Sequence, residues 1–436
     1  MTAVDAPCPD VRPARPVRTP STPIRVGLLG LGHVGSAVAR LARTRPPAAR
    51  ADIEIAAALV RDPLRIRAVQ DVPLTTDPEA VFLARPAVVV EALGGLEPAR
   101  TLVLEAIARG LPVVTANKSL LAHHGDEIAE AAALAGVAVR YEASVIAGVP
   151  FLGTFARRPY ASAVSAITAI VNGTSNFVLS RMQDLAVEFG SALSDAQRRG
   201  FAEPDPYKDV EGVDAAEKLA ILIRLFAGRR VAPSDIETTG IRPVTPADLR
   251  LARELGGTLK PVVTAEGLTS TTGPIGVFAG SAFVPGSHSL ARVHYVSNGI
   301  CLRAAGGSEL CFTGPGAGPD VTAVTVLDDV LDAATGTAES WASAATGSLA
   351  VSPNTPWFVR VTSAVPQPSS ADIATLLAAH GVWTERSAGP DTRDGRPSLA
   401  LLVRSCSRPR IERAASALAA ATGSSVQAYR ALEAGA

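Results

Sequence analysis

The segment that most constrains the fold comes early in the chain, where an apolar run, a glycine motif and an amphipathic stretch follow one another directly. Residues 24–30 read IRVGLLG, as a buried strand does, and residues 30–35 read GLGHVG. The following SAVARLAR repeats apolar residues at helical spacing. In a strand–GxGxxG–helix unit, Gly30 permits the tight turn, Gly32 lets the backbone approach a pyrophosphate, and Gly35 lets helix and strand pack closely. The segment therefore predicts a dinucleotide-binding domain.

The second expected strand, residues 53–60, ends at Arg61 and Asp62. An acid at this place would bind the ribose hydroxyls of NAD, whereas an arginine can accommodate the extra phosphate of NADP. Because both residues are present, the preference stays open, with NADP favoured through Arg61. The alternative is that Arg61 is an ordinary surface arginine.

Two further strands are expected at residues 87–91 and 111–115, and the second leads into ANK, which ends at Lys118. Strand ends of an open parallel sheet face the ligand crevice, so Lys118 is expected where nicotinamide and substrate would meet. A final βα unit closes a doubly wound α/β domain near residue 150. Three histidines of this half lack a partner at ligand spacing and are expected in loops or on the surface: His33, His123 and His124.

Residues 200–218, GFAEPDPYKDVEGVDAAEK, place several carboxylates in a loop before an apolar helix. Asp214 and Lys218 are four residues apart and share one helix face. Such pairs are usually solvated surface bridges. However, only four of the 41 basic residues are lysines, and lysine, unlike arginine, can give up and take back a proton. Lys218 is therefore the leading candidate for proton transfer.

The rest of this 436-residue protein can be divided into segments by changes in composition and in the expected order of helices and strands. Residues 151–319 predict an α+β domain with a mixed sheet, for substrate binding, catalysis and dimerisation, and a helix at 320–335 is expected to pack back on the first domain. Residues 337–355 are rich in Ala, Ser and Gly and predict a linker. Residues 356–436 follow the order βαββαβ, which is ferredoxin-like. Residues 1–23 predict a disordered lead.

The amino-acid composition limits the classes of partner and the cellular compartment that we expect for this protein. Acids and bases balance at 41 each, which argues against nucleic acid or an anionic membrane as the main partner. No apolar run reaches the length of a membrane span, and the lead lacks the apolar core of a secretory signal. Cys8, Cys301, Cys311 and Cys406 have no CxxC spacing. Cys301 and Cys311 could pair only if adjacent strands bring them together, so free thiols in a reducing cytoplasm are the simpler expectation.

Taken together, these motifs resemble homoserine dehydrogenase over nearly all of residues 24–335. The resemblance is carried by GLGHVG, VVEALGG, TANKSLLA, YEASVIAGVP, NGTSNFVLSRM, GFAEPDPYKDVEGVDAAEK and GPGAG, in the family's order. The tail looks like the ACT-type regulatory domain of monofunctional bacterial members, and no aspartate kinase segment is expected before residue 24.

The resemblance implies interconversion of L-aspartate 4-semialdehyde and L-homoserine with NAD(P), on the route to threonine, methionine and isoleucine. Lys218 matches the family's catalytic lysine and would donate the proton to the developing alkoxide, while Lys118 would stabilise its negative charge. The matching substrate-binding positions are Glu203, Asp214, Asp209 in a supporting role, and Gly200. Loop capping is the alternative for Glu203 and Asp209.

The resemblance also implies binding through backbone atoms. Cofactor contacts would come from Leu31, His33, Val34, Leu93 and Gly318, beside Gly30, Gly32, Gly35, Arg61 and Lys118. A monovalent cation, generally sodium in the family, would be held mainly by the carbonyls of Glu142, Val145, Ala147 and Val149. A homodimer or homotetramer is expected as well, because strands within residues 261–310 would otherwise leave apolar edges unpaired.

The tail departs from the usual ACT-domain pattern, and two alternative functions have to be weighed. The tail reads VTSAVPQPSSADI where ACT domains usually place Asp and then Gly before the helix, and this puts threonine inhibition in doubt. Aspartate-semialdehyde dehydrogenase would need a nucleophilic cysteine in the catalytic domain, and no cysteine has the expected surroundings. A non-catalytic nucleotide sensor would be favoured by loss of Lys218, Asp214 or Glu203, all of which are present.

Overall fold

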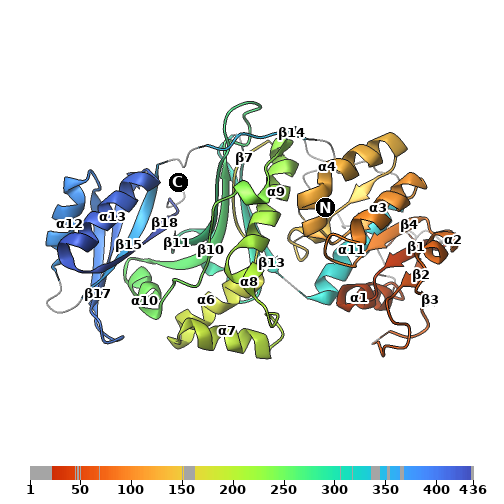
Figure 1. Ribbon diagram of the computed structural model, residues 1–436, viewed down its shortest axis with the longest axis horizontal. Helices are drawn as coiled ribbons and strands as arrows, with labels where there is room; N and C mark the ends of the chain where they lie inside the picture. The colour runs from red at the N-terminus through yellow and green to blue at the C-terminus, as the bar shows by residue number, and fades with distance from the viewer. Residues whose placement is uncertain are drawn as a thin grey trace, which may run out of the picture.

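The computed structural model describes residues 22–433 except 45, 47, 48, 50, 68, 150, 152–162, 305, 317, 335–343, 351–353 and 364–367. The lead expected over residues 1–23 therefore lies outside the described residues, apart from its last two. In Figure 1 the N-terminal domain lies on the right, a large sheet with helices lies in the centre, and the C-terminal unit lies on the left. None of the helices in the described parts of the chain is long and apolar enough to cross a membrane.

The N-terminal domain is a six-stranded parallel sheet with helices on its faces, which confirms the Rossmann-type prediction. The strand order is β3-β2-β1-β4-β5-β6, and each pairing is parallel. The strands are β1 (Ile24–Leu29), β2 (Ile53–Leu59), β3 (Leu74–Thr75), β4 (Val88–Glu91), β5 (Val113–Thr115) and β6 (Val139–Arg140). The helices between them are α1 (His33–Leu41), α2 (Pro78–Leu83), α3 (Ala99–Ala108) and α4 (Lys118–Ala135).

The central strands of this sheet are largely apolar because both of their faces are covered. Val26, Val89 and Val114 are fully buried. A later helix, α11 (Pro319–Ala334), returns to this domain and packs on α1. Its Val326 lies in the same apolar cluster as Val26. The chain thus crosses between the first two domains twice.

The second domain is built on a mixed sheet, as expected. Its strands are β7 (Val164–Ile170), β10 (Gly257–Glu266), β11 (Gly276–Pro285), β12 (Ser297–Ala304) and β13 (Glu309–Pro315). They run in the order β13-β12-β7-β10-β11 with antiparallel pairing, while the short β9 (Thr238–Thr239) pairs parallel with β11. The accompanying helices are α6 (Gly173–Leu185), α7 (Phe189–Arg198), α8 (Tyr207–Val210), α9 (Val213–Ala227) and α10 (Pro246–Glu254).

The C-terminal unit continues the same sheet. Its elements are β15 (Thr355–Thr362), α12 (Ser370–Ala379), β16 (Thr384–Asp391), β17 (Ser398–Cys406), α13 (Arg408–Thr422) and β18 (Ser425–Ala431). The order β18-β15-β17-β16 is joined to β11 through β18, where Ala282 faces Arg430 and Phe283 faces Ala431 in parallel register. This unit therefore has no sheet of its own, and its identification as an ACT-type domain stays a prediction.

The segment expected to be a linker, residues 337–355, is described over residues 344–350 and at 354–355. Within it, β14 (Ala345–Thr346) pairs in parallel with β8 (Arg229–Arg230), which follows α9. Leu349 forms a further bridge with Ile275. The described part of this segment thus lies against the second domain.

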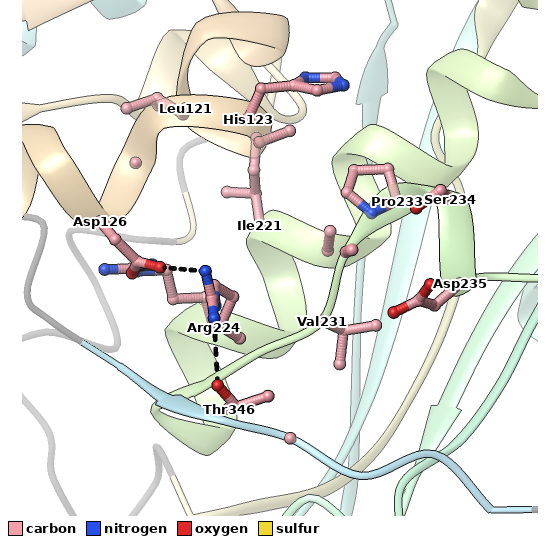
Figure 2. Close-up of a pocket in the computed structure, with 16 residues that line it drawn as sticks. Leu121, His123, Asp126, Ile221, Arg224, Val231, Pro233, Ser234, Asp235 and Thr346 are labelled. Atoms are coloured by element: carbon pink, nitrogen blue, oxygen red, sulfur yellow. Dashed lines mark hydrogen bonds and ion pairs between the residues drawn. The ribbon is translucent and has the colours of Figure 1, made fainter.

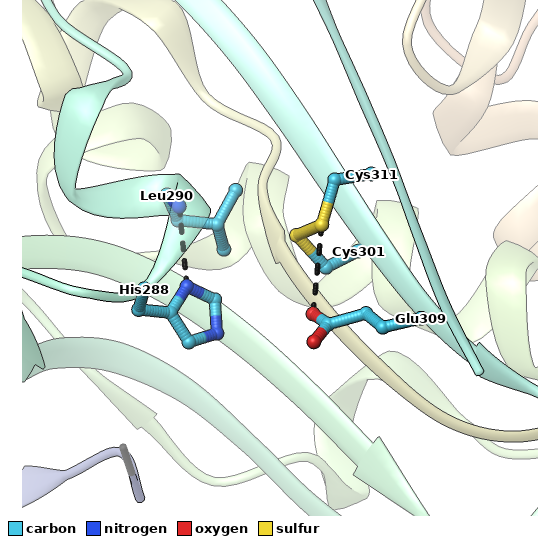
Figure 3. Close-up of a disulfide and its surroundings, with 5 residues drawn as sticks. All are labelled: His288, Leu290, Cys301, Glu309 and Cys311. Atoms are coloured by element: carbon cyan, nitrogen blue, oxygen red, sulfur yellow. Dashed lines mark hydrogen bonds between the residues drawn. A yellow bond between two sulfur atoms is a disulfide. The ribbon is translucent and has the colours of Figure 1, made fainter. Parts of the chain in front are cut away.

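The expectation of free thiols is wrong for Cys301 and Cys311, which form a disulfide (Figure 3). The two residues lie directly opposite each other on β12 and β13, with a Cα–Cα distance of 4.1 Å. Directly opposed residues of a non-hydrogen-bonded antiparallel pair are closest to each other, so their sulfur atoms meet. Spacing in the sequence could not reveal this register. Cys406 is a free, buried thiol.

Candidate active site

The first half of α9 positions the predicted acid–lysine pair at the boundary of the first two domains. The helix starts after Gly212, whose left-handed backbone (φ 84°) turns the chain into it. Asp214 is 4% exposed, and its Oδ2 lies 2.9 Å from Nζ of Lys218. The ammonium of Lys218 also donates to the carbonyl of Val171 at 2.7 Å. Lys218 is thereby held at a fixed place at the end of β7.

Lys118 reaches the same carboxylate from the N-terminal domain. It is the first residue of α4, whose N-cap Asn117 accepts the N–H of Leu120. Its Nζ lies 2.8 Å from Oδ1 of Asp214. Burial alone would raise the pKa of Asp214, but the ammonium groups of Lys218 and Lys118 hold that pKa well below its usual range. The charge of Asp214 raises the pKa of Lys118 in turn, against the opposing effect of burial.

Asn172 completes this cluster, although the sequence analysis did not single it out as a site residue. It is the N-cap of α6, where its side-chain oxygen accepts the N–H of Ser175 at 2.8 Å. Its Nδ2 donates to Asp209 at 2.7 Å and to Asp214 at 2.8 Å. Burial, and next the charge of Asp214, raise the pKa of Asp209. In the sequence, the Asn-Gly pair at residues 172 and 173 indicates the start of a helix, but it does not indicate the contacts with Asp209 and Asp214.

The other predicted substrate residues lie nearby in the loop between α7 and α8. Gly200 has a left-handed backbone (φ 75°) and its N–H donates to the carbonyl of Gln197. Glu203 is exposed, and its carboxylate is not among the hydrogen-bonded groups around Asp214 within the described residues. Its role in substrate binding therefore stays a prediction.

The glycine motif has the geometry that a dinucleotide needs. Gly30 has φ of 100°, and a Cβ there would lie 2.7 Å from the carbonyl oxygen of Ala92. A Cβ on Gly35 would lie 2.1 Å from the oxygen of Gly30, so α1 can approach β1 only with glycine there. Gly32 has open space around it and is the N-cap of α1. The donors of this helix end, including those of His33 and Val34 after the buried Leu31, are placed for a pyrophosphate.

Further predicted cofactor residues follow the carboxyl ends of neighbouring parallel strands. Arg61 comes after β2 and is exposed, Leu93 comes after β4, and Lys118 comes after β5. Gly318, with φ of 137°, directly precedes α11. The carboxyl edge of such a sheet is where ligands bind in open α/β folds.

Glu91 is a second residue that the sequence analysis did not single out. It ends β4 and is fully buried, and burial raises the pKa of its carboxyl. Its oxygens accept the N–H of Leu93 at 2.8 Å and the hydroxyl of Thr115 at 2.6 Å. The glutamate therefore fixes the loop after β4 to the end of β5, immediately before Lys118. An acid closing the apolar run AVVVE was the available signal.

The carbonyls predicted to hold a cation lie in the loop after β6. The oxygen of Ala147 accepts the hydroxyl of Thr325, and that of Val149 accepts the N–H of Phe151 at 2.9 Å. A carbonyl oxygen has two lone pairs, so each of these can take one further partner. The carboxylate of Asp329 on α11 lies 3.0 Å from the N–H of Glu142, at the start of the loop. The binding of a cation by the carbonyls of Glu142, Val145, Ala147 and Val149 stays a prediction.

A cavity of about 330 Å³ lies further along the contact between α4 and α9 (Figure 2). In this view Leu121, His123 and Asp126 come from α4, and Ile221 and Arg224 come from α9. The carboxylate of Asp126 bridges Arg224 and Arg230. No predicted site residue lines this cavity, so the candidate active site is the cluster around Asp214.

Comparison with known proteins places this arrangement in a family. The model for the NAD-binding domain of homoserine dehydrogenase matches residues 30–142, and the homoserine dehydrogenase model matches residues 150–331. The chain is similar to the homoserine dehydrogenase of Synechocystis, with 39% identity over 71% of this chain and 73% of that protein. It is 40% identical to that of Mycobacterium tuberculosis, over 72% of each chain.

Solved structures agree with these matches. A homoserine dehydrogenase from Thiobacillus denitrificans superposes with a TM-score of 0.83 at 32% identity, covering 95% of this chain and 99% of that one. The enzyme from S. aureus superposes with a TM-score of 0.74 at 29% identity, over 94% and 100% of the two chains.

Proposed function

This chain belongs to the homoserine dehydrogenase family of NAD(P)-dependent oxidoreductases that act on a CH–OH group, and from that premise we propose how its own residues carry the reaction. The observation that supports this proposal most strongly is that one buried carboxylate, that of Asp214, pairs with two ammonium groups from two domains. They belong to Lys118, at 2.8 Å, and Lys218, at 2.9 Å. Such an arrangement supplies a proton and a positive charge at the place where cofactor and substrate domains meet. The substrate pair is L-aspartate 4-semialdehyde and L-homoserine.

Bound NAD(P)H supplies a hydride, and the chain supplies the rest. Lys218 donates a proton to the oxygen that becomes the alcohol, and Lys118 stabilises negative charge as it develops there. Asp214 keeps both ammonium groups in place. Asp209 and Glu203 attract the ammonium group of the amino-acid substrate, with Gly200 shaping the loop between α7 and α8. In the oxidation of homoserine, Lys218 accepts the proton.

The cofactor is held by the glycine motif and the carboxyl edge of the parallel sheet. Backbone groups of residues 30–35 would hold the pyrophosphate, and Leu93, after β4, and Gly318, before α11, would contribute further contacts to the cofactor. We favour NADP because Arg61, exposed after β2, can pair with a 2′-phosphate. Changing Arg61 to alanine is expected to lower kcat/KM for NADPH by about fivefold while leaving NADH unchanged, since an exposed charge pair contributes about 1 kcal/mol. An equal loss with both cofactors would contradict this role.

A sodium ion bound to the carbonyls of Glu142, Val145, Ala147 and Val149 would fix the loop that joins the first two domains. Asp329, which is 6% exposed beside this loop, would be stabilised in its ionised form by the bound sodium and would then supply the compensating charge. We expect sodium to raise the thermal unfolding temperature more than choline at equal ionic strength. An Asp329→Asn variant should lose that difference.

The proposal extends to the oligomeric state of the protein and to the role of its C-terminal unit. A homodimer, or a homotetramer, would cover strand edges of the large sheet, and size-exclusion chromatography with light scattering measures this directly. The C-terminal unit would act as an ACT-type domain, and the protein would work in the cytoplasm. The departure noted at the tail falls partly on residues 364–367, which lie outside the described residues.

The reaction is tested by following NADPH or NADH consumption with L-aspartate 4-semialdehyde and by identifying the product chromatographically. L-Homoserine should accumulate in step with cofactor oxidation, and the reverse reaction should occur with L-homoserine and the oxidised cofactor. Absence of turnover in both directions with both cofactors would contradict the proposal and favour a nucleotide-binding sensor.

A further inference from the structure

The disulfide between β12 and β13 lies within a group of metal-ligating atoms that the reaction does not use. The sulfur atoms of Cys301 and Cys311 and a carboxylate oxygen of Glu309 all lie within 4.8 Å of one another. Glu309 and Cys311 are exposed, while Cys301 is buried, so an ion could reach the group from one side. Figure 3 shows the carboxylate of Glu309 next to the sulfur pair, at 3.5 Å from Cys311.

From this group we propose a zinc site that forms when the disulfide is reduced. Its protein ligands are the two thiolates and the carboxylate of Glu309, and water takes the fourth position of a tetrahedron. Two sulfur ligands favour zinc over magnesium or calcium, and a carboxylate oxygen is a common third ligand. The site would connect the two strands when the covalent bond is absent.

The chemistry balances in two steps. A dithiol reductant delivers two electrons and two protons to the disulfide, which breaks the S–S bond and leaves two thiols, while the reductant itself becomes a disulfide. A zinc ion then displaces both thiol protons and forms two Zn–S bonds. Proton release therefore accompanies metal binding to the reduced chain.

The surrounding charges suit a divalent ion. Two thiolates and one carboxylate carry three negative charges, and Arg303, which faces Glu309 across the strands, offsets one of them. The remaining two match the charge of zinc. His288 lies beside the group in Figure 3, but its Nδ1 accepts the N–H of Leu290 at 3.1 Å. Its neutral ring then carries the proton on Nε2, so we do not count it as a ligand.

The test uses the full chain, reduced with a phosphine, desalted under nitrogen and titrated with cobalt(II), which reports thiolate ligation by a sulfur-to-metal charge-transfer band. The band should saturate at a single equivalent per chain, disappear when zinc is added, and be absent from the oxidised protein. Zinc should also raise the thermal unfolding temperature of the reduced chain. A reduced wild type without the band would overturn the proposal.

Variants assign the ligands. Cys311→Ser should abolish the band, and Glu309→Gln should weaken cobalt binding by about tenfold or more; both positions are exposed, so folding should persist. Cys406→Ser and Cys8→Ser are the matched controls and should keep the full band. A band that survives Cys311→Ser, or that disappears in Cys406→Ser or Cys8→Ser, would contradict this ligand set.

Discussion

Replacing Asp214 with asparagine would remove the negative charge that Lys118 and Lys218 share, while keeping the size of the side chain. Removing one partner of a buried ion pair costs about 3–5 kcal/mol, because the remaining charge loses its compensation. The side chain of Lys218 is 13% exposed but that of Lys118 is 34% exposed, so solvent screens part of the effect. We therefore expect a loss of about 3 kcal/mol in the free energy of unfolding, and a fall in kcat of about a hundredfold.

The assay is urea unfolding followed by fluorescence, in which the midpoint falls while the slope m stays the same. The pKa of Asp214 is lowered in the folded state, so its stabilisation is fully present above the unfolded-state value of about 3.9 and is lost as the pH falls through the lower folded value. The difference between wild type and variant should thus be equal at about pH 8 and about pH 5.

A matched control is Asp205→Asn, an exposed carboxylate in the same segment that accepts the N–H of Tyr207. Its effect should stay within about 0.5 kcal/mol. If Asp214→Asn unfolded at the same urea concentration as Asp205→Asn and kept its kcat, the shared carboxylate would not hold the two lysines as described.

Three further predictions concern single residues. Gly35→Ala should weaken NADPH binding at least tenfold by isothermal calorimetry, because a Cβ would lie 2.1 Å from the oxygen of Gly30. Asn172→Ala should lower kcat/KM by about tenfold, since Asp209 and Asp214 each lose a donor, whereas Asn172→Asp, which keeps the helix cap but adds a negative charge, should lower it further. The pKa of Asp329 is raised to about 8 by burial and, to a smaller extent, by the charge of Glu142. In sodium-free buffer the stability of the wild type should therefore fall relative to that of Asp329→Asn as the pH rises from about 5 towards 8. Urea midpoints measure this difference, and a difference that does not change with pH would refute the prediction.

Residues that act through local geometry could be predicted from the sequence. Gly30 and Gly35 follow from a strand–turn–helix pattern that any such unit shares, and Asp214 and Lys218 follow from helical spacing together with the scarcity of lysine. Lys118 followed from its place at the end of a parallel strand. In each case the signal lies within a short stretch of sequence, although the contact of Lys118 with Asp214 on α9 does not.

Contacts between distant segments could not be predicted in this way. Asn172 meets Asp214 only because the end of β7 lies against the start of α9, and Glu91 meets Thr115 only because β4 and β5 are neighbours. The Cys301–Cys311 pair depends on strand register, which a hairpin sequence leaves open. The pairing of β18 with β11 depends on which sheet edge the C-terminal unit packs against, and the hydrophobic periodicity of the sequence does not indicate that edge.

The central claim is that Lys218 is the proton donor, and a comparison of Lys218→Ala with Lys208→Ala tests it most directly. Lys208 lies ten residues earlier in the same segment, and its side chain is 63% exposed. With NADPH and L-aspartate 4-semialdehyde, Lys218→Ala should lose about 10²–10⁴-fold in kcat while still binding NADPH by fluorescence, and Lys208→Ala should retain wild-type kcat. Full turnover by a folded, NADPH-binding Lys218→Ala variant would contradict the account and assign the proton to another group.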